Sequence, residues 1–281
     1  MNRKLRILFI AVLFSLLCLN VFAQQTNSFS YTKTGKGRQA LIFIPGFACS
    51  GHVWDETVQQ FATGNTCYTI TFKGFAGVAP QTDPQIGTWI ADLAAFIKDN
   101  HIEKPVIVGH SLGGIMAMWL AAAYPDLASK IVVVDALPCL PAMRNPAFKV
   151  QEHPACDIMV KQFTGMSDEF FAAMQKRAMP TMLADSSMLD TVVHWSVASD
   201  RTTFGQIYCQ LMNTDLRTKI ADIKCPALIL LEPSFKQFET GVQEQYKLLP
   251  GKTMKYADKG LHFIMFDDKD WYMDQLKSFI L

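Results

Sequence analysis

The sequence has few of the residue groupings that bind metals or nucleic acids. Its seven cysteines and six histidines are scattered, with no C-x-x-C pair and no Cys/His cluster, so a zinc site is not expected. The formal net charge is only +1 and no stretch is strongly basic, which argues against a nucleic-acid partner. Internal repeats, charge runs and low-complexity segments are missing as well. Half of the 281 residues are hydrophobic, which suits one domain with a large core plus an insertion.

The first 23 residues have the features of a secretory signal peptide. Three basic residues lie among the first six, an apolar run covers 7–19, and small residues near Ala23 offer a cleavage site. The apolar run is short for a membrane anchor, and Cys18 lacks the small preceding residue of a lipoprotein site. We therefore expect residues 1–23 to be removed and the mature chain to be exported, to the periplasm or beyond the cell, without a membrane span.

Export would place the six remaining cysteines in an oxidising environment. Six cysteines allow 15 disulfide pairings, and the sequence does not choose among them. Scattered buried thiols are the slightly favoured interpretation. If two cysteines do pair, Cys139 and Cys156 are the best candidates, because both fall in the first part of the same helical segment.

Short apolar strands alternate with amphipathic helices over much of the chain. Near-continuous apolar runs at 39–44, 67–72, 130–135 and 226–231 are typical of strands buried on both faces of a parallel sheet. Residues 86–100 repeat their apolar side chains at helical spacing. This alternation predicts an α/β fold, a mostly parallel sheet with helices on both faces. Ligands of such sheets bind at the carboxyl ends of the strands.

One segment interrupts the alternation. Residues 139–217 show no strand pattern and read as helices rich in methionine and aromatic side chains. We interpret them as a helical lid, or cap, that is inserted between the core segments 24–138 and 218–281 and covers an adaptable apolar pocket. The alternative is that these side chains form ordinary core. The apolar side chains of this segment include Phe163, Phe170, Phe171 and Trp195, and the sequence does not say which of these rings line the pocket.

The turn Gly109-His110-Ser111-Leu112-Gly113 lies between an apolar strand and a helix crowded with small residues. It has the G-x-S-x-G pattern of a nucleophile elbow, a sharp and strained turn that lifts a serine hydroxyl above the sheet edge. The glycines lack a Cβ, which allows the strand and the helix to approach closely. We therefore interpret Ser111 as a nucleophile rather than as part of an ordinary strand-to-helix turn.

Five segments together make the chain resemble α/β-hydrolases from about Gln39 to the C-terminus. They are IFIPGFACSG (42–51), GHSLGG (109–114), IVVVDALP (131–138), CPALILL (225–231) and GLHF (260–263). The resemblance implies an eight-stranded-type α/β-hydrolase sheet with a helical cap and a Ser-His-Asp triad. Ser111 then takes the place of the nucleophile. His262, in the loop after the last strand, takes the place of the general base that a serine nucleophile needs.

The acid is where this sequence departs from the common family pattern. Most relatives carry an aspartate shortly after the strand equivalent to 227–231, but here that loop begins with Glu232 and contains no aspartate. Some relatives, haloalkane dehalogenases among them, use an acid at the end of the preceding strand, which here is Asp135. Many others keep a non-catalytic aspartate at that place. We expect Asp135 to be the acid, within about 3.2 Å of His262 Nδ1, with Glu232 as the alternative.

The resemblance also implies an oxyanion hole made of two main-chain N–H groups, those of Phe47 and Leu112. Relatives usually have His-Gly before the first of these donors, whereas this chain has Pro45-Gly46. The implied reaction is hydrolysis of an ester or ester-like, small and largely apolar substrate through an acyl-enzyme. No metal or organic cofactor is implied.

Other functions are open on the same fold. A perhydrolase or a C–C bond hydrolase would use the same triad. A non-catalytic ligand-binding protein would need a broken triad, whereas Ser111 and His262 are both present. The sequence does not indicate the substrate's identity or the oligomeric state.

Overall fold

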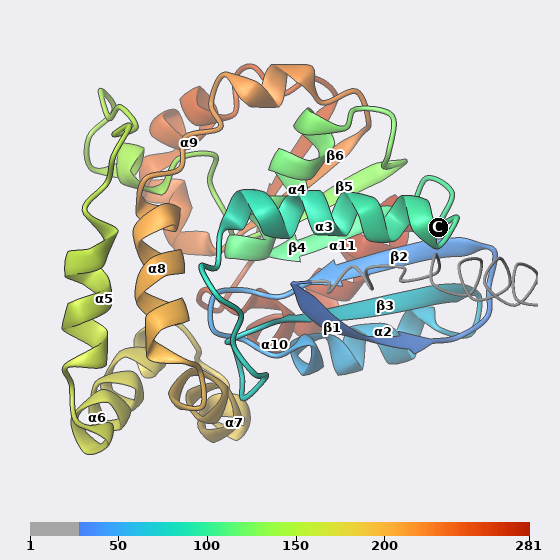
Figure 1. Ribbon diagram of the computed structural model, residues 1–281. Coiled ribbons are helices and arrows are strands. Elements are labelled where there is room, and N and C mark those ends of the chain that lie inside the picture. Colours follow the sequence, from blue (N-terminus) through green and yellow to red (C-terminus); the bar gives the residue numbers. More distant parts are fainter. Residues whose placement is uncertain (1–27) are drawn as a thin grey trace, which may run out of the picture.

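The structure, a computed structural model, describes residues 28–281. The expected signal peptide, residues 1–23, and Cys18 lie outside the described residues, so export stays a prediction. Figure 1 shows a sheet with helices on both faces and a further group of helices beside one end of it. Within 28–281, none of the helices has both the length and the apolar character that crossing a bilayer requires.

Seven strands of the described chain form one sheet, in the order β1-β3-β2-β4-β5-β6-β7. Neighbouring strands are parallel except β1 and β3, which pair antiparallel at one edge. The strands are β1 (Phe29–Thr34), β2 (Gln39–Ile44), β3 (Asn65–Phe72), β4 (Val106–His110), β5 (Lys130–Val134), β6 (Ala227–Leu231) and β7 (Lys252–Tyr256). The predicted mostly parallel α/β-hydrolase sheet is confirmed, with seven strands in the described residues where the resemblance implies eight.

Helices cover both faces of this sheet. They are α2 (Asp55–Phe61), α3 (Ile86–Asp99), α4 (Leu112–Ala123), α9 (Glu239–Gln245), α10 (Ile264–Asp267) and α11 (Lys269–Ile280), with the 3₁₀ turns η1 (Gly51–Trp54) and η5 (Pro233–Phe238). Successive side chains of a strand point to opposite faces. In β2, Ile42 and Ile44 therefore share a core with α3 and α4, whereas Leu41 and Phe43 share the other core with α2 and α11.

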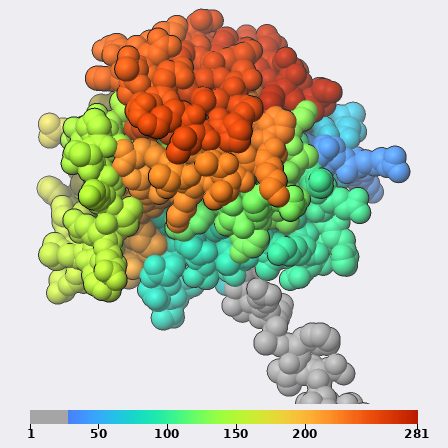
Figure 2. Space-filling model, turned by 90° about the horizontal axis from the view of Figure 1, so that it is seen from above, coloured from blue at the N-terminus to red at the C-terminus, as the bar shows by residue number. Residues whose placement is uncertain are grey.

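Between β5 and β6 the chain forms a group of helices, here called the helical insertion (residues 139–217). Its elements are η2 (Leu140–Met143), α5 (Cys156–Thr164), α6 (Asp168–Ala178), η3 (Met179–Thr181), α7 (Ser186–Val197) and α8 (Arg201–Met212), and the turn η4 (Lys219–Asp222) follows it. Helices α5 and α8 pack against each other. In Figure 2 the yellow-green surface of the insertion adjoins the orange surface of the C-terminal part.

A disulfide joins Cys156, the first residue of α5, to Cys209 in α8. The predicted pair Cys139–Cys156 is therefore wrong. Cys139 is a buried free thiol, and its main-chain N–H donates to Gln245 Oε1 at 3.0 Å, away from α5. The pairing follows from the packing of α5 on α8, which sequence spacing does not reveal. The free cysteines of the described chain, all buried, are Cys49, Cys67, Cys139 and Cys225.

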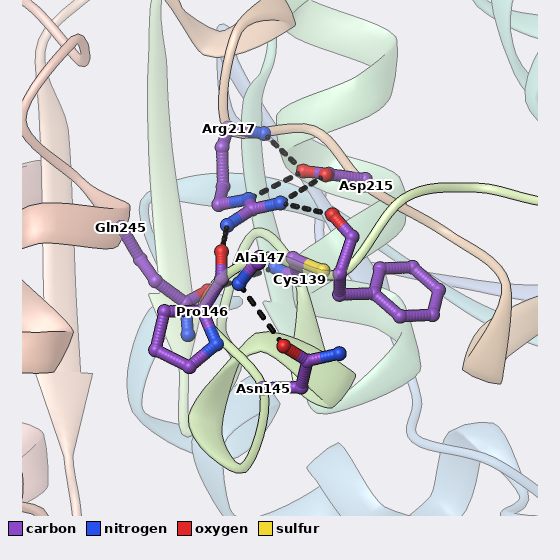
Figure 3. Close-up of polar contacts among 8 residues, drawn as sticks. Cys139, Asn145, Pro146, Ala147, Asp215, Arg217 and Gln245 are labelled. Carbon is purple, nitrogen blue, oxygen red and sulfur yellow. Dashed lines mark hydrogen bonds and ion pairs between the residues drawn. The ribbon is translucent and has the colours of Figure 1, made fainter.

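The two ends of the helical insertion meet at one polar junction (Figure 3). Arg217 donates through Nη1 to the main-chain oxygen of Pro146 at 2.7 Å and through Nη2 to that of Phe148 at 2.8 Å. Its Nε and Nη2 also bond the two carboxylate oxygens of Asp215, at 2.9 and 2.6 Å. One guanidinium therefore fixes the segment that enters the insertion to the segment that leaves it.

Candidate active site

Ser111 lies in a tight turn between the end of β4 and the start of α4. Its backbone has φ 52° and ψ −118°, a conformation that is strained for a residue with a Cβ. The glycines make the turn possible. A Cβ on Gly109 would lie 2.0 Å from Gly113 O, and a Cβ on Gly113 would lie 2.2 Å from Ile44 O. The turn therefore has the close strand–helix approach that the G-x-S-x-G pattern predicts.

Asp135 and His262 come together from two distant parts of the sequence. Asp135 directly follows β5, and His262 lies in the loop between β7 and α10. The His262 Nδ1 and Asp135 Oδ2 atoms are 2.6 Å apart, as the sequence predicts. Because the carboxylate oxygen accepts, Nδ1 carries the proton and Nε2 is left as the acceptor of the ring. The Asp135 side chain is 1% exposed, whereas that of His262 is 26% exposed and borders a cavity.

The second carboxylate oxygen of Asp135 accepts the main-chain N–H of Glu232 at 2.7 Å. The carboxylate of Glu232 instead accepts from Ser234 Oγ, and no hydrogen bond joins it to His262 in the described chain. Burial, together with the charge of nearby Asp135, raises the pKa of Glu232. Of the two candidate acids, Asp135 contacts the imidazole, and Glu232 contributes its peptide N–H to holding Asp135.

Ser111 and His262 line the same cavity, but within residues 28–281 no hydrogen bond joins their side chains. In many enzymes this bond tightens only when substrate is bound. The Nε2 atom of His262 and the Ser111 hydroxyl are therefore both available to a molecule in the cavity.

His110 connects the serine turn to the loop that carries His262. Its Nε2 donates to the main-chain oxygen of His262 at 2.9 Å, and the two ring centroids are 4.6 Å apart. Burial, and then the nearby His262 ring, hold the pKa of His110 well below 6.5. The His110 ring is therefore neutral, with its proton on Nε2, and Nδ1 has no partner in the described part of the chain. The sequence offered no signal for this long-range contact.

The loop of His262 is also bonded to the helical insertion. Asp267 accepts the main-chain N–H of Leu261 through Oδ2 and that of Asp185 through Oδ1, each at 2.8 Å. The N–H of Phe263 donates to Met182 O at 3.2 Å. One carboxylate therefore fixes the start of the His262 loop to the turn before α7.

The main-chain N–H groups of Phe47 and Leu112, the expected oxyanion hole, donate to no other group of residues 28–281. Phe47 follows β2 and lines the cavity, and Leu112 is the first residue of α4, where a helix leaves its N–H groups unpaired. A Cβ on Gly46 would lie 2.8 Å from His110 Nδ1 and 3.3 Å from Ser111 Cβ. The loop of Phe47 therefore lies directly against the serine turn.

A cavity of about 450 Å³ lies between the strand ends and the helical insertion. Ser111, Asp135, Glu232 and His262 line its sheet side. The insertion contributes mostly apolar side chains and a few polar ones, namely Leu140, Gln175, Met179, Thr181, Met182, Val192, Ser196, Phe204, Tyr208 and Leu211. No lysine or arginine of the described residues lines it. Across 28–281, no three His, Cys, Asp or Glu side chains are grouped so that they could hold a metal ion.

The structure identifies which rings of the insertion border this cavity, a point that the sequence left open. Phe204 and Tyr208 of α8 line it, whereas Phe163, Phe170, Phe171 and Trp195 do not. Phe171 is fully buried against Phe163 and Phe204 inside the insertion, and Phe170 is 62% exposed on its surface. Phe163 and Phe171 therefore pack between the insertion's own helices, and Phe170 faces outward.

Known proteins resemble this chain along most of its length. The family model described as the alpha/beta hydrolase family matches residues 41–275. A pimeloyl-[acyl-carrier protein] methyl ester esterase of Aliivibrio fischeri (strain MJ11) is 21% identical over 266 residues, which cover 91% of this chain and 98% of that protein. RutD of Serratia proteamaculans (strain 568), whose name describes a carbamate hydrolase, is 24% identical over 194 residues, 68% of this chain and 71% of RutD.

A solved structure shows the same fold. The enol-lactonase from Burkholderia xenovorans LB400 matches with a TM-score of 0.73 at 15% sequence identity, covering 90% of this chain and 96% of that one. At this identity the likeness concerns the fold and not the substrate.

Proposed function

Because the chain is an enzyme of the α/β-hydrolase family, we propose that it is a serine hydrolase that cleaves an ester or ester-like substrate through an acyl-enzyme. The observation that carries the proposal is the pairing of His262 Nδ1 with buried Asp135 at 2.6 Å, beside a cavity that Ser111 also lines. The ends of β4 and β5 and the loop after β7 supply these three residues.

In the proposed reaction His262 acts as general base and then as general acid. Its Nε2 takes the Ser111 proton as Oγ attacks the ester carbonyl, and Asp135 stabilises the resulting imidazolium through Nδ1–H. The same proton passes to the leaving alcohol when the C–O bond breaks. A water molecule, deprotonated by Nε2, then cleaves the acyl-enzyme, and Ser111 recovers its proton.

The main-chain N–H groups of Phe47 and Leu112 are proposed to bind the oxyanion of each tetrahedral intermediate. Both donors are unpaired within the described residues, so they need not break other bonds to do so. The N-terminus of α4, where Leu112 lies, adds the positive end of a helix dipole. Donors held in place in this way stabilise charge that develops in the transition state.

The cavity supports a small, uncharged and largely apolar substrate. Its insertion side is formed by aliphatic, thioether and aromatic side chains, and no lysine or arginine of the described chain is present to pair with an anion. The names of the sequence relatives describe a methyl ester esterase and a carbamate hydrolase, which supports chemistry at an ester-like carbonyl. We propose the insertion as the lid of this cavity.

Export of the mature chain is also part of the proposal. The disulfide Cys156–Cys209 supports it, because disulfides persist mainly in oxidising compartments.

A panel of p-nitrophenyl esters of increasing acyl length, run beside amide and lactone panels, tests the function. We expect turnover of esters that Ser111→Ala and His262→Ala each reduce by about 10⁴-fold or more, while their melting temperatures stay near that of the wild type. Ester turnover that survives in either purified variant would refute the proposal.

A further inference from the structure

We infer that the substrate carries an uncharged hydrogen-bond acceptor, remote from the scissile carbonyl, which the side-chain amide of Gln175 recognises. The inference rests on the proposed hydrolase function of the same cavity and narrows its substrate class. The expected substrates are esters with a second neutral oxygen, such as that of a ketone or an ether, rather than simple alkyl esters.

Gln175 is a buried polar side chain in the mostly apolar wall of the cavity. It lies near the end of α6, is only 7% exposed, and borders the cavity directly. The Ser196 hydroxyl of α7 donates to Gln175 Oε1 at 2.8 Å. This bond orients the amide with Oε1 towards Ser196, which leaves both N–H groups of Nε2 free to donate.

The donor side of this amide has no partner. No group of the described chain accepts from Gln175 Nε2, and this atom keeps some accessible surface, whereas the unpartnered Gln245 Nε2 is fully buried. Because Gln175 is only 7% exposed and lines the cavity, we assign this accessible surface of Nε2 to the cavity. A buried polar group is normally paired, so an oriented and unpaired donor in an apolar wall points to a ligand acceptor.

The other two polar side chains that η3 and α7 place on this wall already donate within the chain. The Thr181 hydroxyl donates to Ala178 O at 2.7 Å, and the Ser196 hydroxyl donates to Gln175 itself. Around them lie methionine and valine side chains that offer no hydrogen bond. Among α6, η3 and α7, the Gln175 amide is therefore the group placed to read a polar feature of the substrate.

The acceptor should be neutral. The carboxylates of Asp135 and Glu232 both line the cavity, and no lysine or arginine of residues 28–281 does. An anionic group would be repelled by them and would lose hydration without gaining a cationic partner. A ketone, ether or amide oxygen accepts from Nε2 without that penalty.

Matched esters test the inference. One set places a ketone or methyl-ether oxygen at successive positions of the acyl chain, a second set places it in the alcohol, and each is paired with the alkyl ester of equal length. We expect the wild type to prefer at least one oxygen-bearing ester, because its alkyl partner leaves Nε2 unpaired. Gln175→Met, similar in volume but without the amide, should reduce that preference in kcat/KM about 10-fold or more.

Two further variants test whether the preference depends on the N–H groups of Gln175. Gln175→Glu keeps an acceptor for Ser196 but lacks the N–H groups, so it should lose the preference as well. Gln243→Met, a matched change at an exposed glutamine, should keep the wild-type ratio. Esters that are hydrolysed with the same ratio in wild type and Gln175→Met would overturn the inference alone. A failure to hydrolyse any ester, with Ser111 unlabelled by a phosphonate probe, would instead overturn the proposed function.

Discussion

His110 holds the main-chain oxygen of His262 at 2.9 Å, so the residue before the proposed nucleophile is bonded to the residue proposed as base. The carbonyl only accepts, and His110 is buried, so this contact needs a neutral ring with its proton on Nε2. Protonation would add a charge where burial and the neighbouring His262 oppose it, which is why the pKa of His110 lies well below 6.5.

This lowered pKa predicts a loss of stability in acid. The unfolded chain binds a proton at residue 110 once the pH falls below about 6.5, whereas the folded chain does not, so unfolding is favoured as the pH decreases. His110→Gln keeps an N–H donor but removes the titration. Denaturant unfolding is measured between about pH 6.5 and 4.5. Over this range the free energy of unfolding of the wild type should decrease by up to about 1.4 kcal/mol per pH unit more than that of His110→Gln.

A second histidine variant is the control. His194 is exposed on α7, so His194→Gln should keep the wild-type pH dependence of unfolding. Parallel pH curves for wild type and His110→Gln would contradict the account of the buried ring.

Asp135 and Glu232 give the second prediction. Asp135→Asn should reduce ester turnover by up to about 10⁴-fold, because an amide would stabilise the wrong tautomer of His262. Glu232→Gln should cost little, since Glu232 supports Asp135 through its main-chain N–H, which the substitution leaves in place. Steady-state kinetics of the two purified variants decide between them. A larger loss in Glu232→Gln would move the role of the acid to Glu232.

The sheet could be predicted from its apolar strand patterns, and the pairing of Asp135 with His262 from the resemblance to α/β-hydrolases. Carboxyl ends of parallel strands meet at one edge, and β4 and β5 are neighbours, so Ser111 and Asp135 lie on adjacent strand ends. The insertion was harder to predict. Helical periodicity does not say which face of a helix packs on its neighbours. The sequence therefore could not separate Phe171, which is buried between helices, from Phe204, which lines the cavity.

Because the packing of the helices is not readable from periodicity, neither the disulfide nor the contact between Gln175 and Ser196 could be predicted from the sequence. Cys156 and Cys209 are 53 positions apart and meet only because α5 packs on α8. Gln175 meets Ser196 through the packing of α6 on α7, a contact between side chains with no motif around them.

The cavity rings predict a change of substrate preference, the third prediction. Phe204 lines the cavity and contacts the Phe47 ring at 4.5 Å between centroids. Phe204→Ala should enlarge the cavity and shift kcat/KM from shorter towards longer acyl chains by about 10-fold. Because Phe204 is also buried, its truncation can destabilise the protein. Melting temperatures of Phe204→Ala and of the milder variant Phe204→Leu distinguish a reshaped cavity from partial unfolding. Phe170→Ala, at an exposed ring, should leave the chain-length profile unchanged.

The disulfide gives the fourth prediction. The bridge Cys156–Cys209 closes a loop with a sequence separation of 53, which in the chain-entropy model is worth about 4 kcal/mol of stability. Reduction, Cys156→Ala and the double variant Cys156→Ala/Cys209→Ala should therefore lower stability by similar amounts, since each removes the same bond. Peptide mapping without reductant should find Cys139 as a free thiol. A bridge that involves Cys139 would contradict the structure.

The most direct measurement of the central claim is the identity of the residue that becomes covalently modified. The protein is treated with a p-nitrophenyl phosphonate, an analogue that a serine nucleophile attacks but releases slowly, and the adduct is mapped by peptide mass spectrometry. The account predicts one adduct, on Ser111, formed with loss of ester turnover, absent in Ser111→Ala and strongly slowed in His262→Ala. Loss of ester turnover in the wild type while Ser111 stays unmodified would contradict the account. Ester hydrolysis by the Ser111→Ala variant would contradict it as well.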